Sequence, residues 1–508
     1  MSAVRAVPTT ESGVGRGAQR AALPVLVGVT GLVAVVSSLG APLIPSIAQS
    51  YHVSLSAAEW VLTATLMTGA LATPAMGRLA DGPRKRQVVE VALGAVLVGC
   101  VISAVSTDFA VLVIGRGLQG FGLGLLPVTM AMARSQFPPQ KAGRAIATLS
   151  VSVAIGAGLG YPITTLVAQI FGFRAAFWFG AITVAVALLL VVLVLPSRSD
   201  GRSRRFDYPG MVTLGAAVVG VSVLLSEGGS WGWTSLRSLG LVAFGLIMMG
   251  LWIARELRIS DPLIDVRQVR NRSVLTADAS GFLIAIAMYM FLPIIIEFVQ
   301  VPVASGYGFG TSIVVSGLVF VPLSVGTFLA SRCLPAYMRR FGMRSMIPVG
   351  SVVFAVTMLF FATEHRALWE AFVVAGFGGI GIGFTFAAMP GFIVQAVPAS
   401  ETGSAMGLYQ VLRSIGLSLG SALAAAVLLA YTTHGHIYPT YQGFRVTLLI
   451  ASALCMTTAV LSFFLPGKIS GRPSAPTKEV EKLMEEEAEV EGVGLMLADE
   501  RLLTESGE

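Results

Sequence analysis

The stretch FAVLVIGRGLQGFGLGLLPVTMAMA, residues 109–133, contains a single charged side chain, Arg116. An apolar run of this length exceeds the roughly 20 residues that an α-helix needs to cross a bilayer. Similar runs fill most of the chain, and 55% of its 508 residues are hydrophobic while only 12% are charged. Soluble domains usually carry about 25% charged residues. We therefore predict an all-α integral membrane protein.

Apolar runs of at least about 18 residues, bounded by charges or turn residues, predict fourteen membrane-spanning helices. They are placed at residues 22–46, 57–80, 87–107, 109–134, 142–168, 175–196, 209–226, 236–255, 273–300, 309–334, 344–363, 368–395, 402–431 and 443–466. The expected order along the chain is a cytoplasmic N-terminal tail (1–21), an N-terminal six-helix bundle (22–196), a linker with two extra transmembrane helices (197–272), a C-terminal six-helix bundle (273–466) and an acidic cytoplasmic tail (467–508).

The distribution of basic residues predicts the orientation. With the N-terminus inside, 28 of the 34 Lys and Arg residues fall in inside segments and 4 in outside loops. Cytoplasmic loops of membrane proteins carry such an excess. The net charge of +7 therefore reflects topology rather than nucleic-acid binding. We expect a multi-pass protein of the bacterial inner cell membrane with both termini in the cytoplasm.

An internal repeat relates the two predicted bundles. Glycines of the first bundle recur about 260 residues later: Gly120, Gly122 and Gly124 as Gly379, Gly381 and Gly383, and Gly156 and Gly160 as Gly416 and Gly420. Eight helices, an even number, separate equivalent positions, so both halves share one orientation across the membrane. Such a parallel pair can enclose a cavity at the membrane midplane.

Ionisable residues inside a membrane are costly, so each is a candidate functional group, and four stand out within the predicted helices. They are Arg116, Asp278, Glu297 and Arg413. Asp278 and Glu297 stand 19 residues apart in one helix, roughly 28 Å along its axis. They cannot share one proton directly, but each could accept a proton from its own side of the membrane. The alternative is that both extend to water at opposite helix ends.

Arg116 and Gln119 lie one helical turn apart in a glycine-rich segment that allows close approach of helices. Both a cavity position and a structural role are open for Arg116. Arg413 has the same ambiguity, and we interpret it, with Gly416 and Gly420, as a structural tie.

A short loop, GRLADGPRKRQ (77–87), joins the second and third predicted helices. Asp81 could pair with a basic residue of a neighbouring helix in one conformer and lose that pair in another, which would make a conformational gate. The candidate gate residues are Gly77, Asp81, Arg84, Lys85 and Arg86. The positive-inside rule also accounts for the three basic residues without a gate.

Several classes of function lack their motifs. The chain has no G-x-x-x-x-G-K-[ST] phosphate loop and no nucleophile motif such as G-x-S-x-G. Its three Cys stand singly and its four His lie in loops, so neither a disulfide nor a metal site is predicted. We expect no enzymatic activity, no cofactor and no ATP-driven transport. The expected partners are a small-molecule substrate, protons and the lipid bilayer, with no nucleic acid, and the protein is expected to be a monomer.

These motifs resemble those of the major facilitator superfamily, and within it the fourteen-helix drug:proton antiporter branch. The loop at 77–87 resembles the family's G-x-L-a-D-r-x-G-r-k loop, and RGLQGFG (116–122) resembles its fourth-helix motif R-x-x-q-G-x-g. Arg413, Gly416 and Gly420 resemble the R-x-x-G-x-x-x-G run of its penultimate helix. The resemblance covers about residues 22–466.

Two segments depart from the family pattern. The first helix has Val36 where the family has an acid and Ala41 where it has Asn, and the fifth-helix antiporter motif is reduced to GYPITT (160–165). By the resemblance, the first and fourth helices of each half line the cavity, and proton coupling falls to Asp278 or Glu297. The cavity residues implied in this way are Arg116, Gln119, Asp278 and Glu297.

The resemblance implies a secondary active transporter that exports amphipathic or cationic small molecules in exchange for protons, as multidrug efflux proteins do, by alternating access. A proton-coupled symporter or a lipid exporter of the same fold is the alternative within transport, because the first-helix acid is missing. From a different class, a non-transporting membrane scaffold or sensor remains open. The acidic tail, with 11 of the 27 acidic residues, would then bind a partner.

Overall fold

The computed structural model is entirely helical throughout the residues that it describes, which confirms the predicted all-α fold class. These residues are 16–37, 39–80, 82–137, 139–195, 207–232, 234–259, 266–363, 367–396, 402–433 and 438–463. The predicted acidic tail, 467–508, lies outside them.

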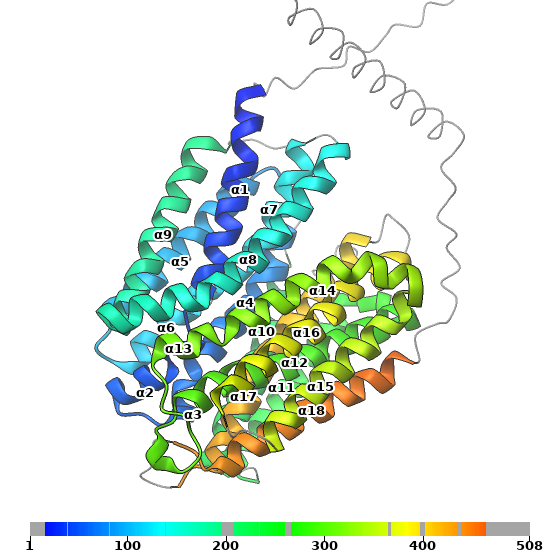
Figure 1. The fold of residues 1–508 in the computed structure, drawn as a ribbon. Coiled ribbons are helices and arrows are strands. Elements are labelled where there is room, and N and C mark those ends of the chain that lie inside the picture. Colours follow the sequence, from blue (N-terminus) through cyan, green and yellow to red (C-terminus); the bar gives the residue numbers. More distant parts are fainter. Residues whose placement is uncertain are drawn as a thin grey trace, which may run out of the picture. The chain divides into compact units, whose positions relative to one another are not determined.

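The helices fall into three consecutive sets, and Figure 1 follows them along the chain by colour. We call the first set the N-terminal helices: α1 (Arg16–Ser37), α2 (Ile44–Tyr51), α3 (Leu55–Ala58), α4 (Trp60–Ala80), α5 (Lys85–Val105), α6 (Phe109–Gln119), α7 (Leu125–Gln136), α8 (Pro139–Phe171) and α9 (Phe173–Val194). Two linker helices follow: α10 (Tyr208–Trp231) and α11 (Leu236–Glu256). We call the last set the C-terminal helices: α12 (Arg272–Gln300), α13 (Ile313–Leu318), α14 (Phe320–Phe341), α15 (Met346–Thr363), α16 (Leu368–Ala396), α17 (Thr402–Ala430) and α18 (Tyr441–Ser462). Short 3₁₀ turns are η1 (Ala41–Leu43), η2 (Gly120–Gly124), η3 (Val266–Arg270), η4 (Val303–Ser305) and η5 (Met343–Ser345).

Each predicted span overlaps helix over the residues that the structure describes. Within the described residues, eleven stretches are long and apolar enough to cross a membrane, and two shorter apolar stretches, Leu159–Phe171 and Tyr208–Leu224, lie in α8 and α10. Many apolar helices of this length make the chain a multi-pass membrane protein. The grouping of the spans into two six-helix bundles and a linker stays a prediction.

Two predicted spans are interrupted where their sequences contain Gly and Pro. The span predicted at 22–46 ends as α1 at Ser37 and continues through η1 and α2. Gly40, Pro42 and Pro45 lie at this interruption, and a proline cannot donate the amide hydrogen bond that a helix interior requires. The span predicted at 109–134 changes from α6 to the 3₁₀ turn η2 across its glycines.

The repeated glycines make equivalent contacts in the two halves. A Cβ atom on Gly120 would collide with the carbonyl oxygen of Thr65 on α4, and one on Gly379 would collide with that of Leu323 on α14. The fourth span of each half therefore packs its backbone directly on the second span. Only glycine permits this approach, because any other residue places an atom in the occupied space.

A second pair of glycines repeats the pattern between the first and fifth spans of each half. A Cβ on Gly156 of α8 would strike the carbonyl oxygen of Gly31 on α1, and one on Gly416 of α17 would lie 2.6 Å from the carbonyl oxygen of Phe282 on α12. The sequence repeat is thus also a repeat of helix packing.

The N-terminal and C-terminal helices pack together along two seams: α4 lies along α17, and α8 lies against α13 and α14. Loops that the basic-residue pattern places outside meet at one end of these helices. There Tyr51 Oη donates to the Ser106 carbonyl at 3.0 Å, and Gln49 Nε2 donates to Tyr438 Oη at 2.8 Å. We call this the outer end, and the opposite one, where α12 begins, the inner end.

Candidate functional site

Three of the four ionisable residues predicted inside helices are buried in protein. Arg116 and Glu297 are 0% exposed and Asp278 is 1% exposed, while Arg413 is half-buried. Burial to this degree does not fit the alternative in which the two carboxyl groups reach water at the helix ends.

Arg116 is held by a chain of hydrogen bonds within the N-terminal helices. Its Nε donates to the Val61 carbonyl at 3.2 Å, and its Nη1 donates to Gln119 Oε1 at 2.5 Å. Gln119 Nε2 in turn donates to Ser103 Oγ at 3.1 Å. The structure therefore brings together Arg116 and Gln119, which the sequence predicted from their one-turn spacing.

The third guanidinium nitrogen of Arg116, Nη2, faces the interruption after α1. A Cβ on Gly40 would lie only 2.7 Å from Nη2, so a glycine there leaves room for the guanidinium. Among the described residues Nη2 has no hydrogen-bond partner. A buried donor of this kind is costly until an acceptor reaches it. The Arg116 site therefore keeps one donor for a further acceptor.

Asp278 lies on the second turn of α12, near the inner end. Neither of its carboxyl oxygens receives a hydrogen bond from the described part of the chain. One turn further on, a Cβ on Gly281 would lie 2.7 Å from the Tyr409 ring and 3.0 Å from the Met389 sulfur. The carboxyl group is thus buried near the Tyr409 side chain. Such a group is satisfied only by a proton or by a cation brought to it.

Glu297, at the outer end of α12, interacts with the carboxyl group of Glu59, a residue that no sequence motif marks. Both side chains are 0% exposed. Neither oxygen of Glu297 nor Oε1 of Glu59 receives a hydrogen bond from another described residue. Two carboxyl groups can form a hydrogen bond only when one of them carries a proton. The N-terminal and C-terminal helices therefore meet here at a pair of acids.

Local structure explains why Glu59 points inward. Ser54 Oγ accepts the Ala57 amide and starts the short helix α3, and the Glu59 carbonyl accepts the amides of Leu62 and Thr63, which starts α4. Glu59 thus stands at the junction of two helices, and α17 packs against α3.

Hydroxyl groups from both halves surround this acid pair. Ser421 Oγ of α17 donates to Glu59 Oε2 at 3.4 Å and lies 3.0 Å from Thr63 Oγ1. Nearby, Gln300 Nε2 donates to the Pro42 carbonyl at 3.2 Å and to Ser316 Oγ at 2.7 Å. Polar contacts between the N-terminal and C-terminal helices therefore gather at the outer end.

The loop after α12 covers the acid pair from the outer side. Tyr307 Oη donates to the Pro439 carbonyl at 2.5 Å. Burial, and to a smaller extent the negative charge of Glu297, raise the pKa of Tyr307, so its hydroxyl stays protonated and remains a donor.

The sequence contains one signal for Glu59. It is an acid inside the span predicted at 57–80, two residues after the first residue of that span. Its neighbour Trp60 donates through Nε1 to Glu227 Oε1 at 3.1 Å, and Glu227 follows the span predicted at 209–226. Only the tertiary structure shows that a boundary acid such as Glu59 turns into the protein.

Arg413 packs within the C-terminal helices. Its guanidinium carbon lies 4.6 Å from the centre of the Phe386 ring, and its Nη1 donates to Gln410 Oε1 at 3.3 Å. Gly416 and Gly420 on the same helix approach the backbone of α12 at Phe282 and Ile286. The role of a structural tie for Arg413, Gly416 and Gly420 stays a prediction.

The loop predicted as a gate is described only in part, because Asp81 lies outside the described residues. Arg84 is exposed and Lys85 is buried. Arg86 donates to the carbonyls of Val192 and Leu195 and pairs with Glu90 at 2.6 Å. Arg86 therefore ties α5 to the C-terminal end of α9, where a cation is favourable. The gate itself stays a prediction.

Aromatic side chains line the second seam between the halves. Tyr161 of α8 stacks on Phe320 of α14 with ring centres 4.5 Å apart. Close by, Gly317 of α13 admits the Thr165 side chain of α8. Tyr161 and Thr165 belong to the segment GYPITT, so this departure from the family's fifth-helix motif lies at the contact between halves.

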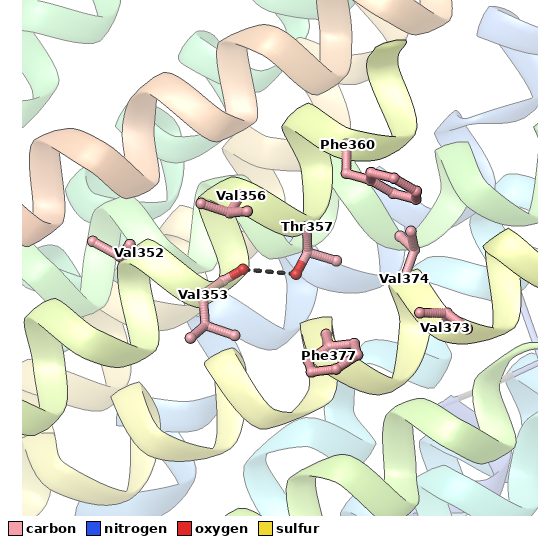
Figure 2. A pocket seen from close by; sticks show the side chains of 8 residues that line it. All are labelled: Val352, Val353, Val356, Thr357, Phe360, Val373, Val374 and Phe377. Atoms are coloured by element: carbon pink, nitrogen blue, oxygen red, sulfur yellow. Dashed lines mark hydrogen bonds between the residues drawn. The ribbon is translucent and has the colours of Figure 1, made fainter. Parts of the chain in front are cut away.

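A separate cavity of about 410 Å³ lies between α15 and α16 (Figure 2). Its lining is apolar except for Thr357, whose hydroxyl donates to the Val353 carbonyl at 2.6 Å. Two of the lining residues, Val356 and Phe377, are more than half exposed. The cavity is therefore a groove on the outside of the helices. None of the predicted site residues lines this groove, so it is not the predicted central cavity.

Metal-binding side chains do not cluster in the described ranges. No group of three or more His, Cys, Asp or Glu residues there could hold a metal ion. Cys100, Cys333 and Cys455 are free thiols, the first and last of them buried. His365, His434 and His436 lie outside the described residues.

A family profile and individual proteins of known name are similar in sequence to this chain. A sequence profile described as Major Facilitator Superfamily matches residues 26–421 and 279–503. The chain is 27% identical to Multidrug resistance protein Stp of Mycobacterium tuberculosis over 394 aligned residues. The aligned region covers 76% of this chain and 72% of that protein. It is 28% identical over 429 residues to the Tetracenomycin C resistance and export protein of Streptomyces glaucescens, which covers 82% of this chain and 77% of that protein.

Solved structures share the fold at low identity. A peptide transporter POT in complex with sulfate superposes with a TM-score of 0.65 at 12% identity, over 87% of this chain and 93% of that one. The similarity extends over almost the whole length of that transporter.

Proposed function

The chain belongs to the major facilitator superfamily, and on this premise we propose that it exports amphipathic, cationic small molecules in exchange for protons. The family and the fold make it a membrane transporter and not an enzyme. The export of drug-like molecules is supported by relatives named for multidrug resistance and for resistance and export.

One observation carries the exchange of a proton for a cation. The helix α12 holds two buried carboxyl groups, Asp278 and Glu297, and none of their four oxygens receives a hydrogen bond from the described residues. A carboxylate in apolar surroundings needs a compensating positive charge. Either a proton or a cationic substrate can supply this charge, so the movement of one can be linked to the movement of the other.

The two carboxyl groups have different roles in this proposal. Asp278, near the inner end and beside Tyr409, takes the substrate cation from the cytoplasm, because an aromatic face and a carboxylate together favour an organic cation. Glu297, near the outer end, takes a proton from outside. One proton exchanged for one monovalent cation moves no net charge, so the pH gradient drives the exchange. A difference of about one pH unit yields ~1.4 kcal/mol, enough for a substrate gradient of roughly tenfold.

Alternating access is supported by where the two halves touch. Polar contacts between the N-terminal and C-terminal helices gather at the outer end, as at Gln49 and Tyr438. Breaking these contacts and forming others at the inner end would expose the site to the outside. Because both halves lie in one chain, we propose that a single copy of the protein transports the substrate. We also propose that it lies in the inner membrane with both termini in the cytoplasm.

Flux through reconstituted protein tests this function. Proteoliposomes carrying an imposed pH gradient should take up an aromatic monovalent cation such as ethidium, and dissipating the gradient should stop uptake. We expect Asp278→Asn and Glu297→Gln to reduce gradient-driven uptake to the level of empty liposomes. Glu370→Gln is the matched control, because Glu370 Oε2 only accepts the Ala367 amide at the start of α16. Wild-type uptake in both α12 variants, or uptake indifferent to the gradient, contradicts the proposal.

A further inference from the structure

We propose that Glu59 and Glu297 together form one proton-binding site between the N-terminal and C-terminal helices, and that the proton bound there holds the outer end closed. This inference rests on the proposed function and assigns a role to Glu59, which no motif assigns. The site takes a proton, and its two halves come from helices that must separate for the outer end to open.

The burial of this pair favours a shared proton in the closed form. The two carboxyl groups interact directly and are fully buried. The single neutral donor described at the pair is Ser421 Oγ, 3.4 Å from Glu59 Oε2. One proton converts one carboxylate into a donor and the other into its acceptor. Without it, two negative charges face each other where water does not screen them.

Neighbouring charged groups do not replace the proton. Arg116 of α6 is a buried cation, but its described donors go to the Val61 carbonyl and to Gln119, and its Nη2 points toward Gly40. Tyr307, with its hydroxyl on the Pro439 carbonyl, caps the pair from the outer loop. Other ionisable groups on the surrounding elements at this end are His52, Glu227, Glu370, Tyr438, Tyr441 and Arg445. None of them donates to Glu297 or to Glu59 Oε1.

The contacts that close the outer end lie around this pair. Gln49 Nε2 donates to Tyr438 Oη at 2.8 Å, Gln300 Nε2 to the Pro42 carbonyl at 3.2 Å, and the Val314 amide to Gln169 Oε1 at 3.1 Å. Each joins the N-terminal to the C-terminal helices. These neutral hydrogen bonds are individually weak, so repulsion between two buried carboxylates at their centre opposes them all.

Closing of the outer end on protonation, and its opening on deprotonation, is the direction that an exporter driven by proton uptake requires. While the outer end is open, the pair is hydrated and receives a proton from outside, and the protonated pair lets the two halves close. When the closed form loses the proton to the inner side, the two carboxylates repel and the outer end reopens. Each cycle therefore carries one proton inward between two openings to the outside, and the proton is bound and released unchanged.

Distance measurements between spin labels test the inference without any transport assay. Ser50 on α2 and Thr440 before α18 are exposed and lie on opposite sides of the closure. Full-length Ser50→Cys/Thr440→Cys protein in lipid nanodiscs needs only the exposed Cys333 replaced by Ser, because Cys100 and Cys455 are buried. Inter-label distances are then recorded from about pH 5 to about pH 9, a range that spans the ionisation of carboxyl groups buried to different degrees.

We expect a short distance at acidic pH and a severalfold rise in a longer-distance population at alkaline pH. Glu59→Gln and Glu297→Gln should each keep the short distance throughout, because one ionised carboxylate beside a neutral amide is not repelled. Glu59→Lys should do the same by forming an ion pair with Glu297. His52→Gln and Glu370→Gln are controls that should retain the response.

A distance that does not change with pH in the parent protein, or a response that survives in Glu59→Gln, overturns the inference. These outcomes are separable from failure of the proposed function. If uptake requires Glu297 but the inter-label distance does not change with pH, the results support proton-coupled exchange and contradict the proton site that closes the outer end. If the inter-label distance changes with pH but a pH gradient does not drive uptake, the results support the closing site and contradict proton-coupled export.

Discussion

Replacing Gly416 with Ala should separate the helices α12 and α17, which hold Asp278, Glu297 and Ser421. The new Cβ would lie 2.6 Å from the Phe282 carbonyl oxygen and 3.0 Å from the Ala285 Cβ. Carbon and oxygen atoms in close packing approach to about 3.3 Å, so α17 must move away by roughly 0.7 Å. Overpacking of this kind costs about 1–3 kcal/mol, and the better helix propensity of Ala returns up to about 1 kcal/mol.

The expected net loss is therefore about 1–2 kcal/mol of folding free energy, measured as a lower unfolding temperature of the purified protein in detergent. Gly94→Ala on α5 is the matched control, because nothing lies within 4 Å of its new Cβ, and it should be neutral or stabilising. Gly156→Ala, the equivalent change in the first half, should lower the unfolding temperature as Gly416→Ala does. If Gly416→Ala is as stable as Gly94→Ala, the packing argument is refuted.

Three further changes have outcomes that follow from single contacts. Arg116→Leu should destabilise the protein by about 3 kcal/mol or more, because Gln119 and the Val61 carbonyl both lose a charged donor; a thermal melt with Arg116→Lys alongside checks this. Tyr307→Phe should cost about 1 kcal/mol. Because the pKa of Tyr307 is raised, that contribution is complete below about pH 10, the ordinary tyrosine value, and falls as pH rises above it, so the difference between the two melts should shrink only in strongly alkaline buffer. Deleting 467–508 should leave gradient-driven uptake unchanged, whereas a scaffold that works through its acidic tail would lose its partner in a pull-down.

Apolar length and glycine spacing predicted most of the fold. The spans appear as helices because each run is long enough to require internal hydrogen bonds for its backbone in lipid. The repeat predicted from Gly156 and Gly416 corresponds to equivalent backbone contacts. The end of α1 at Ser37 was not predicted, because hydropathy averages over Gly40 and Pro42 while backbone geometry does not.

The candidate site was only partly accessible to sequence reasoning. The one-turn spacing of Arg116 and Gln119 determined their contact, because neighbours on one helix face meet whatever the tertiary structure. The partner of Glu297 could not be found in this way. Glu59 is 238 positions earlier in the chain, in the other half, and only the packing of α3 and α17 brings the two carboxyl groups together.

The glycine contacts within each half also determine where the protein can deform. Where backbone rests on backbone, as at Gly120 and Thr65, no side-chain torsion is available to absorb a displacement. Between the halves, by contrast, long side chains such as Tyr161 and Phe320 meet, and these can change rotamer as the surfaces slide. If the protein works by the proposed alternating access, we expect each half to move as a stiff piece and side chains at the seams between the halves to adjust.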